Sequence, residues 1–174
     1  MKRSALMLAF VWLFALAGCD SGGANPSAAS SAEATAAPSG PEPDRAMLAA
    51  TKQRKALFTL IFKNYLPIAS MARERIPFDA DVVRTNAEHI QNLGAMMADV
   101  FETDTRGSGV VTESLDAIWE QPEKYAQKIS AFQAASVALV GAAATGDEAT
   151  IKASAGRLGQ SCGSCHDDFR VDDD

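Results

Sequence analysis

The chain has 174 residues, of which 47% are hydrophobic and 22% are charged, a composition typical of a soluble globular protein. This length accommodates one domain of ordinary size together with attached segments. The net charge of −6 argues against nucleic acid as a partner, because phosphate groups are bound by clustered Lys and Arg side chains.

The N-terminal segment predicts export. A short basic start is followed by an apolar run from Ala5 to Ala17, which is too short to span a bilayer but suits a signal peptide over residues 1–18. The run ends in Leu16–Ala17–Gly18–Cys19, which resembles the lipobox of bacterial lipoproteins. The resemblance implies cleavage before Cys19, lipidation of its thiol, and a periplasmic protein anchored to a membrane. A plain signal peptide with an incidental cysteine is the alternative.

Residues 19–43 consist mostly of Ser, Ala, Gly and Pro, with almost no large apolar side chain. Such a segment cannot bury enough surface to offset the entropy lost on ordering. We therefore expect a lipidated, flexible tether over residues 19–43 and a folded domain over residues 44–174.

Helical periodicity begins after Pro43, and no alternating strand pattern accompanies it. The first predicted helix spans residues 44–71, and its inner face is Met47, Thr51, Arg54, Phe58, Ile61, Tyr65 and Ile68. The second opens at Pro77–Phe78–Asp79 and continues to Phe101.

A long connection follows, and Pro122 is well placed in the first turn of a third helix. Asp147 can cap a fourth helix that extends to Arg170. Four amphipathic helices predict an all-α fold, an antiparallel up-down-up-down four-helix bundle.

The sequence Cys162–Gly163–Ser164–Cys165–His166 has the spacing of the attachment motif for a c-type haem. Positions i, i+3 and i+4 share one face of a helix, so both thiols can meet the vinyl groups while His166 binds the iron. A redox CxxC pair would be expected in a βαβ unit. A structural zinc site needs four ligands, and only a remote His89 could add to the motif. The motif predicts one covalent haem c.

The first helix should face the other side of this haem, because the first and last helices of such a bundle are antiparallel neighbours. Phe58 lies in the middle of the facing stretch and cannot bind iron, whereas Met47 could close the site and favour electron transfer. Arg54 lies on the buried face, where a guanidinium needs an anionic partner such as a haem propionate. The alternatives are a core aromatic at position 58 and an arginine that reaches solvent at position 54. Other methionines, Met97 included, are interpreted as packing.

Three segments resemble the cytochrome c′ family of exported four-helix-bundle cytochromes: Arg54–Lys55–Ala56–Leu57–Phe58, Ile76–Pro77–Phe78–Asp79, and Cys162 through Arg170. The resemblance implies a five-coordinate, high-spin iron with His166 as its only protein ligand, and binding of NO or CO. It places Arg170 near the proximal side. We expect no enzymatic activity, because a haem peroxidase or NO-consuming enzyme would need a distal His or Arg positioned for acid–base work. Electron transfer to an unidentified redox protein and a homodimer are also compatible with it.

The chain departs from the family pattern at Phe58, where many members have an aliphatic residue, so we expect a more crowded distal pocket. Phe169 replaces a common Tyr, and the lipobox replaces a free N-terminus. A low-spin, six-coordinate electron carrier of the same fold, with a methionine such as Met47 as sixth ligand, is the alternative function.

Overall fold

The structure is a computed structural model that describes residues 44–171. The predicted signal peptide and the whole predicted tether, Cys19 included, lie outside the described residues, as do residues 172–174. The elements in chain order are α1 (Arg45–Ala72), α2 (Ala80–Gly94), the 3₁₀ turn η1 (Asp99–Phe101), α3 (Ala117–Glu120), α4 (Pro122–Thr145) and α5 (Glu148–Phe169).

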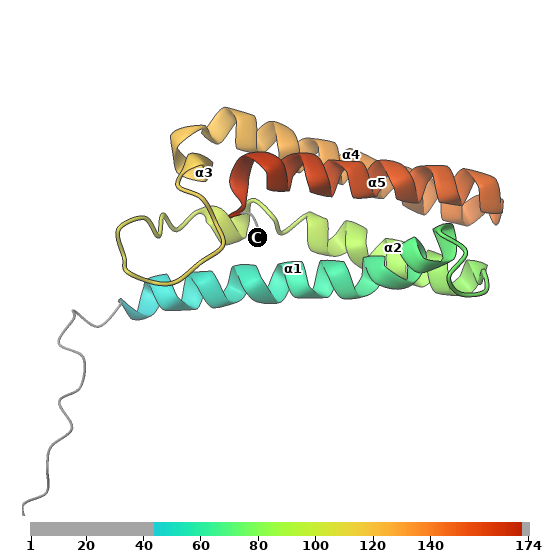
Figure 1. Ribbon diagram of the computed structural model, residues 1–174, viewed down its shortest axis with the longest axis horizontal. Coiled ribbons are helices and arrows are strands. Elements are labelled where there is room, and N and C mark those ends of the chain that lie inside the picture. Colours follow the sequence, from blue (N-terminus) through green and yellow to red (C-terminus); the bar gives the residue numbers. More distant parts are fainter. Residues whose placement is uncertain (1–43, 172–174) are drawn as a thin grey trace, which may run out of the picture. The chain divides into compact units, whose positions relative to one another are not determined.

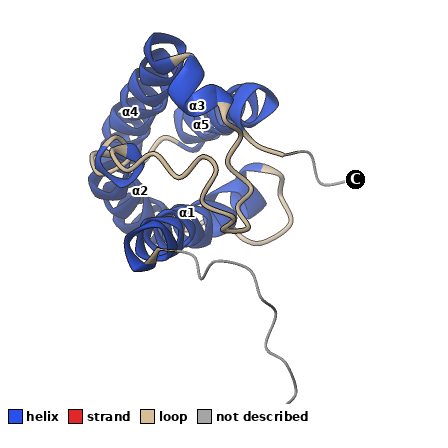
Figure 2. Ribbon diagram, turned by 90° about the vertical axis from the view of Figure 1, so that its left-hand side faces the viewer, coloured by secondary structure: helices blue, strands red, loops and turns tan. Residues whose placement is uncertain are grey.

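The four long helices form an antiparallel bundle. In Figure 1, α1 and α2 form one pair, and α4 and α5 form a second pair beside it. Contacts join α1 to α2, α2 to α4, α4 to α5 and α5 back to α1, so the helices enclose a common core, as the end-on view in Figure 2 shows. This arrangement confirms the predicted four-helix bundle and the predicted adjacency of its first and last helices.

Local sequence signals set where the helices begin and end. The carboxylates of Asp44, Asp79 and Asp147 accept hydrogen bonds from backbone N–H groups in the first turns of α1, α2 and α5. Pro122 occupies the first turn of α4, where its missing N–H costs no hydrogen bond. Gly146 ends α4 at a φ of 70°, a left-handed conformation that glycine adopts without strain.

The core is aliphatic and aromatic, and α1 contributes a continuous face to it. Leu57, Ile61 and Ile68 are buried, as expected for one face of an amphipathic helix. Met47 and Phe58, predicted on the same face, are only partly buried.

The predicted second helix is too long, because α2 stops at Gly94. A Cβ atom at position 94 would lie 2.7 Å from Cε1 of Phe132, so α4 packs directly on the glycine backbone. The side-chain amide of Gln133 donates to the Gly94 carbonyl oxygen at 3.1 Å. After Gly94 the chain turns at residues 95–98 and re-forms only the short η1.

The connection between η1 and α4 is held against the end of α5. The Leu115 N–H donates to the Phe169 carbonyl oxygen at 3.0 Å, and the Val171 N–H donates to the Glu113 carbonyl oxygen at 2.9 Å. These two bonds, together with the short helix α3, fix a segment that was expected only as a loop. They bring residues 111–114 beside the cysteine motif.

Candidate functional site

A cavity of about 1000 Å³ opens between α1 and α5 and extends to α4 and the 111–114 segment. This volume is at the upper end of what cofactor sites in proteins enclose. The cavity is lined by all six predicted cofactor-site residues: Arg54, Phe58, Cys162, Cys165, His166 and Arg170. The structure therefore brings together side chains that are more than 100 positions apart in the sequence.

The two thiols lie in an apolar part of the wall. Burial raises the pKa of the Cys162 thiol, and it raises the pKa of the Cys165 thiol to about 11 against the opposing charge of Lys128. Neither cysteine forms a disulfide. Two free thiols in apolar surroundings, three positions apart on α5, suit thioether bonds to the vinyl groups of a haem.

The pairing of α1 with α5 sets which residues share the cavity. The Tyr65 hydroxyl donates to the Ala155 carbonyl oxygen at 3.1 Å. Because the two helices are antiparallel, Phe58 and Arg54, about two and three turns nearer the start of α1 than Tyr65, fall beside the later residues of α5. Phe58 and the cysteine motif therefore line the same cavity.

Phe58 presents only carbon to the cavity and packs edge-on against Phe101, with ring centroids 6.1 Å apart. Met47, the methionine proposed as an alternative iron ligand, does not line the cavity. Met97 does, and only 4% of its surface is exposed. Interpreting Met97 as packing alone was therefore incomplete.

Arg54 is buried as predicted, and the hydrogen-bond partners of its guanidinium among the described residues are neutral. Its Nε donates to the Val100 carbonyl oxygen and its Nη1 to Oγ1 of Thr105, both at 2.7 Å, and its Nη2 donates to the Thr103 carbonyl oxygen. These neutral acceptors satisfy the guanidinium, although burial lowers its pKa. A contact between Arg54 and a haem propionate remains a prediction, since the residue also lines the cavity.

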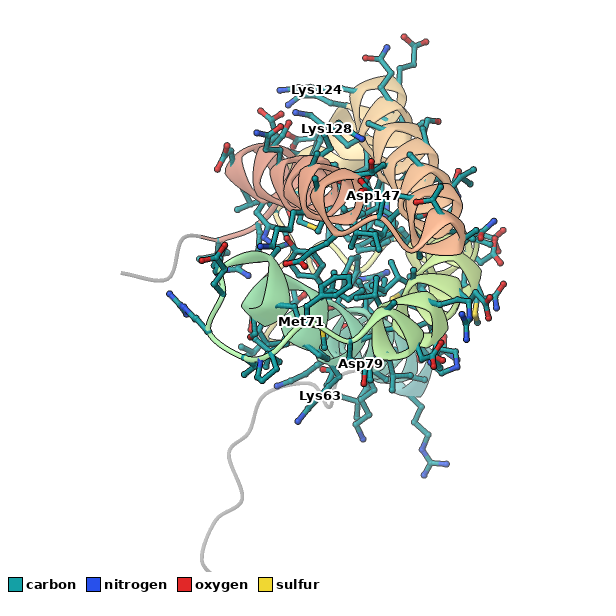
Figure 3. All side chains as sticks on the ribbon, turned by 90° about the vertical axis from the view of Figure 1, so that its right-hand side faces the viewer. Lys63, Met71, Asp79, Lys124, Lys128 and Asp147 are labelled. Carbon is teal, nitrogen blue, oxygen red and sulfur yellow. The ribbon has the colours of Figure 1, made fainter. Side chains whose placement is uncertain are left out.

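The last turns of α5 are tied to α4 by a lysine pair. Lys124 and Lys128 donate to the two carboxylate oxygens of Asp168 at 2.6 and 2.8 Å. Lys128 also donates to the backbone and side-chain oxygens of Ser164, within the cysteine motif. Figure 3 shows both lysines on the flank of α4 that lies beside α5. These bonds hold the turn that carries His166.

Sequence reasoning missed two groups of cavity residues. Phe101 and Tyr125 both line the cavity and contact each other, with ring centroids 5.0 Å apart. Residues 111–114 reach the cavity because their backbone pairs with the end of α5, and no residue pattern predicts that pairing.

The arrangement fits a haem held at one edge by two thioethers. The volume, the apolar wall around the thiols and the imidazole one position after the second cysteine all match such a group. Cationic side chains also line the cavity, among them Lys55 on α1 and Arg73 at its end, and such side chains suit the propionates of a haem.

Comparison with known proteins agrees with this fit. A family model described as Cytochrome C′ matches residues 49–170. Cytochrome c-554 of Cereibacter sphaeroides is 36% identical over 124 residues, covering 69% of this chain and 79% of that protein. Cytochrome c′ of Rubrivivax gelatinosus is 35% identical over 122 residues, covering 70% of this chain and 93% of that protein.

Solved structures show the same fold. The structure of Rubrivivax gelatinosus cytochrome c′ superposes with a TM-score of 0.66 at 35% identity, covering 70% of this chain and 94% of the other. A nitric oxide complex of a mutant cytochrome c′ from Alcaligenes xylosoxidans superposes with a TM-score of 0.66 at 29% identity, covering 72% and 97%. The chain belongs to the cytochrome c′ family, whose members carry one covalently attached haem c.

Proposed function

We propose that this protein is an exported, high-spin cytochrome that binds NO or CO at a five-coordinate haem iron. The observation that carries the proposal is the composition of the cavity, which combines two thiols and an imidazole on α5 with the carbon-only side chain of Phe58 on α1. A site with one protein ligand on the iron and an apolar residue on the other wall is suited to small uncharged ligands.

Each residue has a distinct role in this proposal. Cys162 and Cys165 attach the haem, and His166 binds its iron. The bound haem supplies a redox-active iron that can also bind diatomic gases. Phe58 excludes water and larger molecules from the second face, and Arg170 lines the wall near His166.

The side chains on α4 support the proximal ligand. Lys128 on α4 donates to the Ser164 carbonyl oxygen and forms an ion pair with Asp168, and both of these partners lie on α5. These two interactions hold the turn of α5 that carries His166. The imidazole orientation therefore depends on α4 as well as on α5. The structure of a relative in complex with nitric oxide supports a gas ligand of the same class.

A low-spin electron carrier is the second candidate, and Met97 is the observation that favours it. Met97 is the one methionine among the cavity-lining residues within the described part of the chain, so it replaces Met47 as the candidate sixth ligand. Electron transfer through an open-site haem is part of the first proposal as well. Neither candidate assigns a catalytic residue.

We further infer that the protein is periplasmic and held to a membrane through a lipid on Cys19, with residues 19–43 as the tether. The lipobox-like sequence that ends at Cys19 supports this inference. A homodimer and a redox partner protein are compatible with the proposal, which does not depend on either.

A titration with CO tests the proposed function. The reduced holoprotein should bind one CO per haem, with a shift of its Soret band that follows a single binding curve. A Soret band that stays unchanged in CO-saturated buffer would contradict the proposal. In that case Met97→Leu, which removes the second candidate ligand, should convert the protein to a CO-binding form if the low-spin alternative is correct.

A further inference from the structure

The Phe101 ring contacts Phe58 on α1 and Tyr125 on α4. Its ring meets the Phe58 ring at 62° with a centroid separation of 6.1 Å, and it meets the Tyr125 ring at 68° and 5.0 Å. Both are edge-to-face contacts, which aromatic pairs prefer. A Phe58 ring that turned toward α4 would therefore meet Phe101.

Arg54 fixes the segment that carries Phe101. Its guanidinium bonds to residues 100, 103 and 105, on the chain just before and just after Phe101. The guanidinium carbon also lies 4.7 Å from the centre of the Phe101 ring, a cation–π contact. With 3% of its surface exposed, Arg54 makes these contacts away from solvent, where they are stronger than at the surface.

The carbonyl of Phe101 is fixed from a second direction. Nε1 of Trp119 donates to the Phe101 carbonyl oxygen at 3.2 Å, and the Arg54 guanidinium also lies 5.0 Å from the Trp119 ring. Phe101 is thus held by its ring, by its own carbonyl and by the residues on both sides of it.

We propose that Arg54 and Phe101 are positioning residues that limit how fast a gas ligand reaches the iron. Arg54 holds Phe101 against Phe58, and Phe101 fills the space into which the Phe58 ring must move to admit a ligand. Arg54 and Phe58 are one turn apart on α1. The same helix therefore carries the Phe58 ring, which covers the iron, and the Arg54 side chain, which holds Phe101 in place. This inference rests on the proposed function, because it requires an iron site that is open behind Phe58.

The expected size of the effect follows from the ring contact. The edge-to-face contact between Phe58 and Phe101 raises the free-energy barrier to movement of the Phe58 ring. Loss of this contact should therefore raise the rate of ligand entry about two- to tenfold. Arg54→Lys keeps the positive charge but loses the forked set of bonds, so it should raise the rate in the same direction.

The experiment is flash photolysis of the CO complex of the reduced holoprotein, with the bimolecular association rate as the readout. Phe58→Ala, Phe101→Leu and Arg54→Lys should each rebind CO faster than the wild type. Phe78→Leu is the matched control, because Phe78 packs on the core but does not line the cavity. In the Phe58→Ala background, Phe101→Leu should give no further increase, since no ring remains to be obstructed.

The outcomes separate this inference from the proposed function. Failure of the wild type to bind CO would contradict the proposed function itself. Faster rebinding in Phe58→Ala with an unchanged rate in Phe101→Leu would overturn only the present inference, as would an equal increase in Phe78→Leu.

A second readout does not depend on ligand binding. The losses of unfolding free energy for Phe58→Ala and Phe101→Leu should be non-additive in a double-mutant cycle on the CO-free holoprotein. Additive losses would mean that the two rings do not support each other, and would also overturn the inference.

Discussion

The Tyr65 hydroxyl donates to the Ala155 carbonyl oxygen at 3.1 Å, and both residues line the cavity that we assign to the haem. The bond joins the two helices that supply opposite walls of the site. It depends on Gly159, one turn further along α5, because a Cβ atom there would overlap the Tyr65 hydroxyl oxygen. The tyrosine and the glycine together set the register of α1 against α5.

Gly159→Ala is therefore expected to destabilise the protein by about 1–3 kcal/mol, because the added methyl group displaces the Tyr65 hydroxyl from its hydrogen bond to Ala155. In a Tyr65→Phe background the cost should fall, since the nearest remaining ring atom, Cζ, lies 3.4 Å from the added Cβ. Denaturant unfolding of the holoproteins measures both effects.

Gly141→Ala is the control for helix propensity. Gly141 lies within α4 and has open space where a Cβ would be, so alanine should stabilise the protein by up to about 1 kcal/mol. A Gly159→Ala cost that is unchanged by Tyr65→Phe would show that the two residues do not compete for the same space.

The bundle could be predicted from the sequence because its signals are local. Aspartates at three helix starts, the proline of α4 and the spacing of apolar residues each act within a few positions. The end of α2 could not be predicted in this way. Gly94, the last residue of α2, packs against Phe132 and Gln133 of α4, which are 38 and 39 positions away.

In the candidate site, too, the residues marked by local sequence patterns could be predicted, and those placed by long-range contacts could not. The cysteine motif was identifiable because its five residues are consecutive, and Phe58 followed from the antiparallel pairing of α1 with α5. The surroundings of Arg54 did not follow, because they depend on how residues 100–105 fold back onto α1. A buried arginine alone does not reveal whether carboxylates or backbone carbonyls satisfy it.

Asp168→Asn should lower the stability of the folded protein at neutral pH but not in acid. Hydrogen bonds from Lys124 and Lys128 hold the pKa of the Asp168 carboxyl below its ordinary value of 3.8 in the folded protein. A depressed pKa stabilises the folded state above the unfolded-state pKa, and this contribution is lost as the pH falls through the folded-state value.

The measurement is the difference in thermal midpoint between the wild type and Asp168→Asn across a pH series. The difference should be present at neutral pH and should shrink below about pH 4. A difference that is constant across the series would show that the carboxylate charge contributes nothing to the folded state.

Substitution of both cysteines should remove covalent attachment without removing the cavity. The Cys162→Ser/Cys165→Ser protein is expected to release its haem when it is denatured in acidified organic solvent, whereas the wild-type polypeptide should keep it. Mass spectrometry of the denatured chains distinguishes the two. Haem retained by the doubly substituted chain would contradict the assignment of these thiols.

Cys19→Ala should release the protein from membranes. If Cys19 carries the lipid, the wild type should fractionate with membranes and incorporate labelled palmitate, and the variant should do neither. A variant that remains membrane-bound after washing with high salt would contradict the lipid anchor, because salt removes only electrostatic attachment.

The coordination number of the iron distinguishes an open gas-binding site from a closed electron carrier. Resonance Raman spectra of the reduced, ligand-free holoprotein report whether the iron is five-coordinate and high-spin or six-coordinate and low-spin. With His166 as the only protein ligand and Phe58 on the opposite wall, we expect marker bands of a five-coordinate, high-spin haem. Bands of a six-coordinate, low-spin haem would contradict this expectation and would identify a second protein ligand, with Met97 as the first residue to substitute.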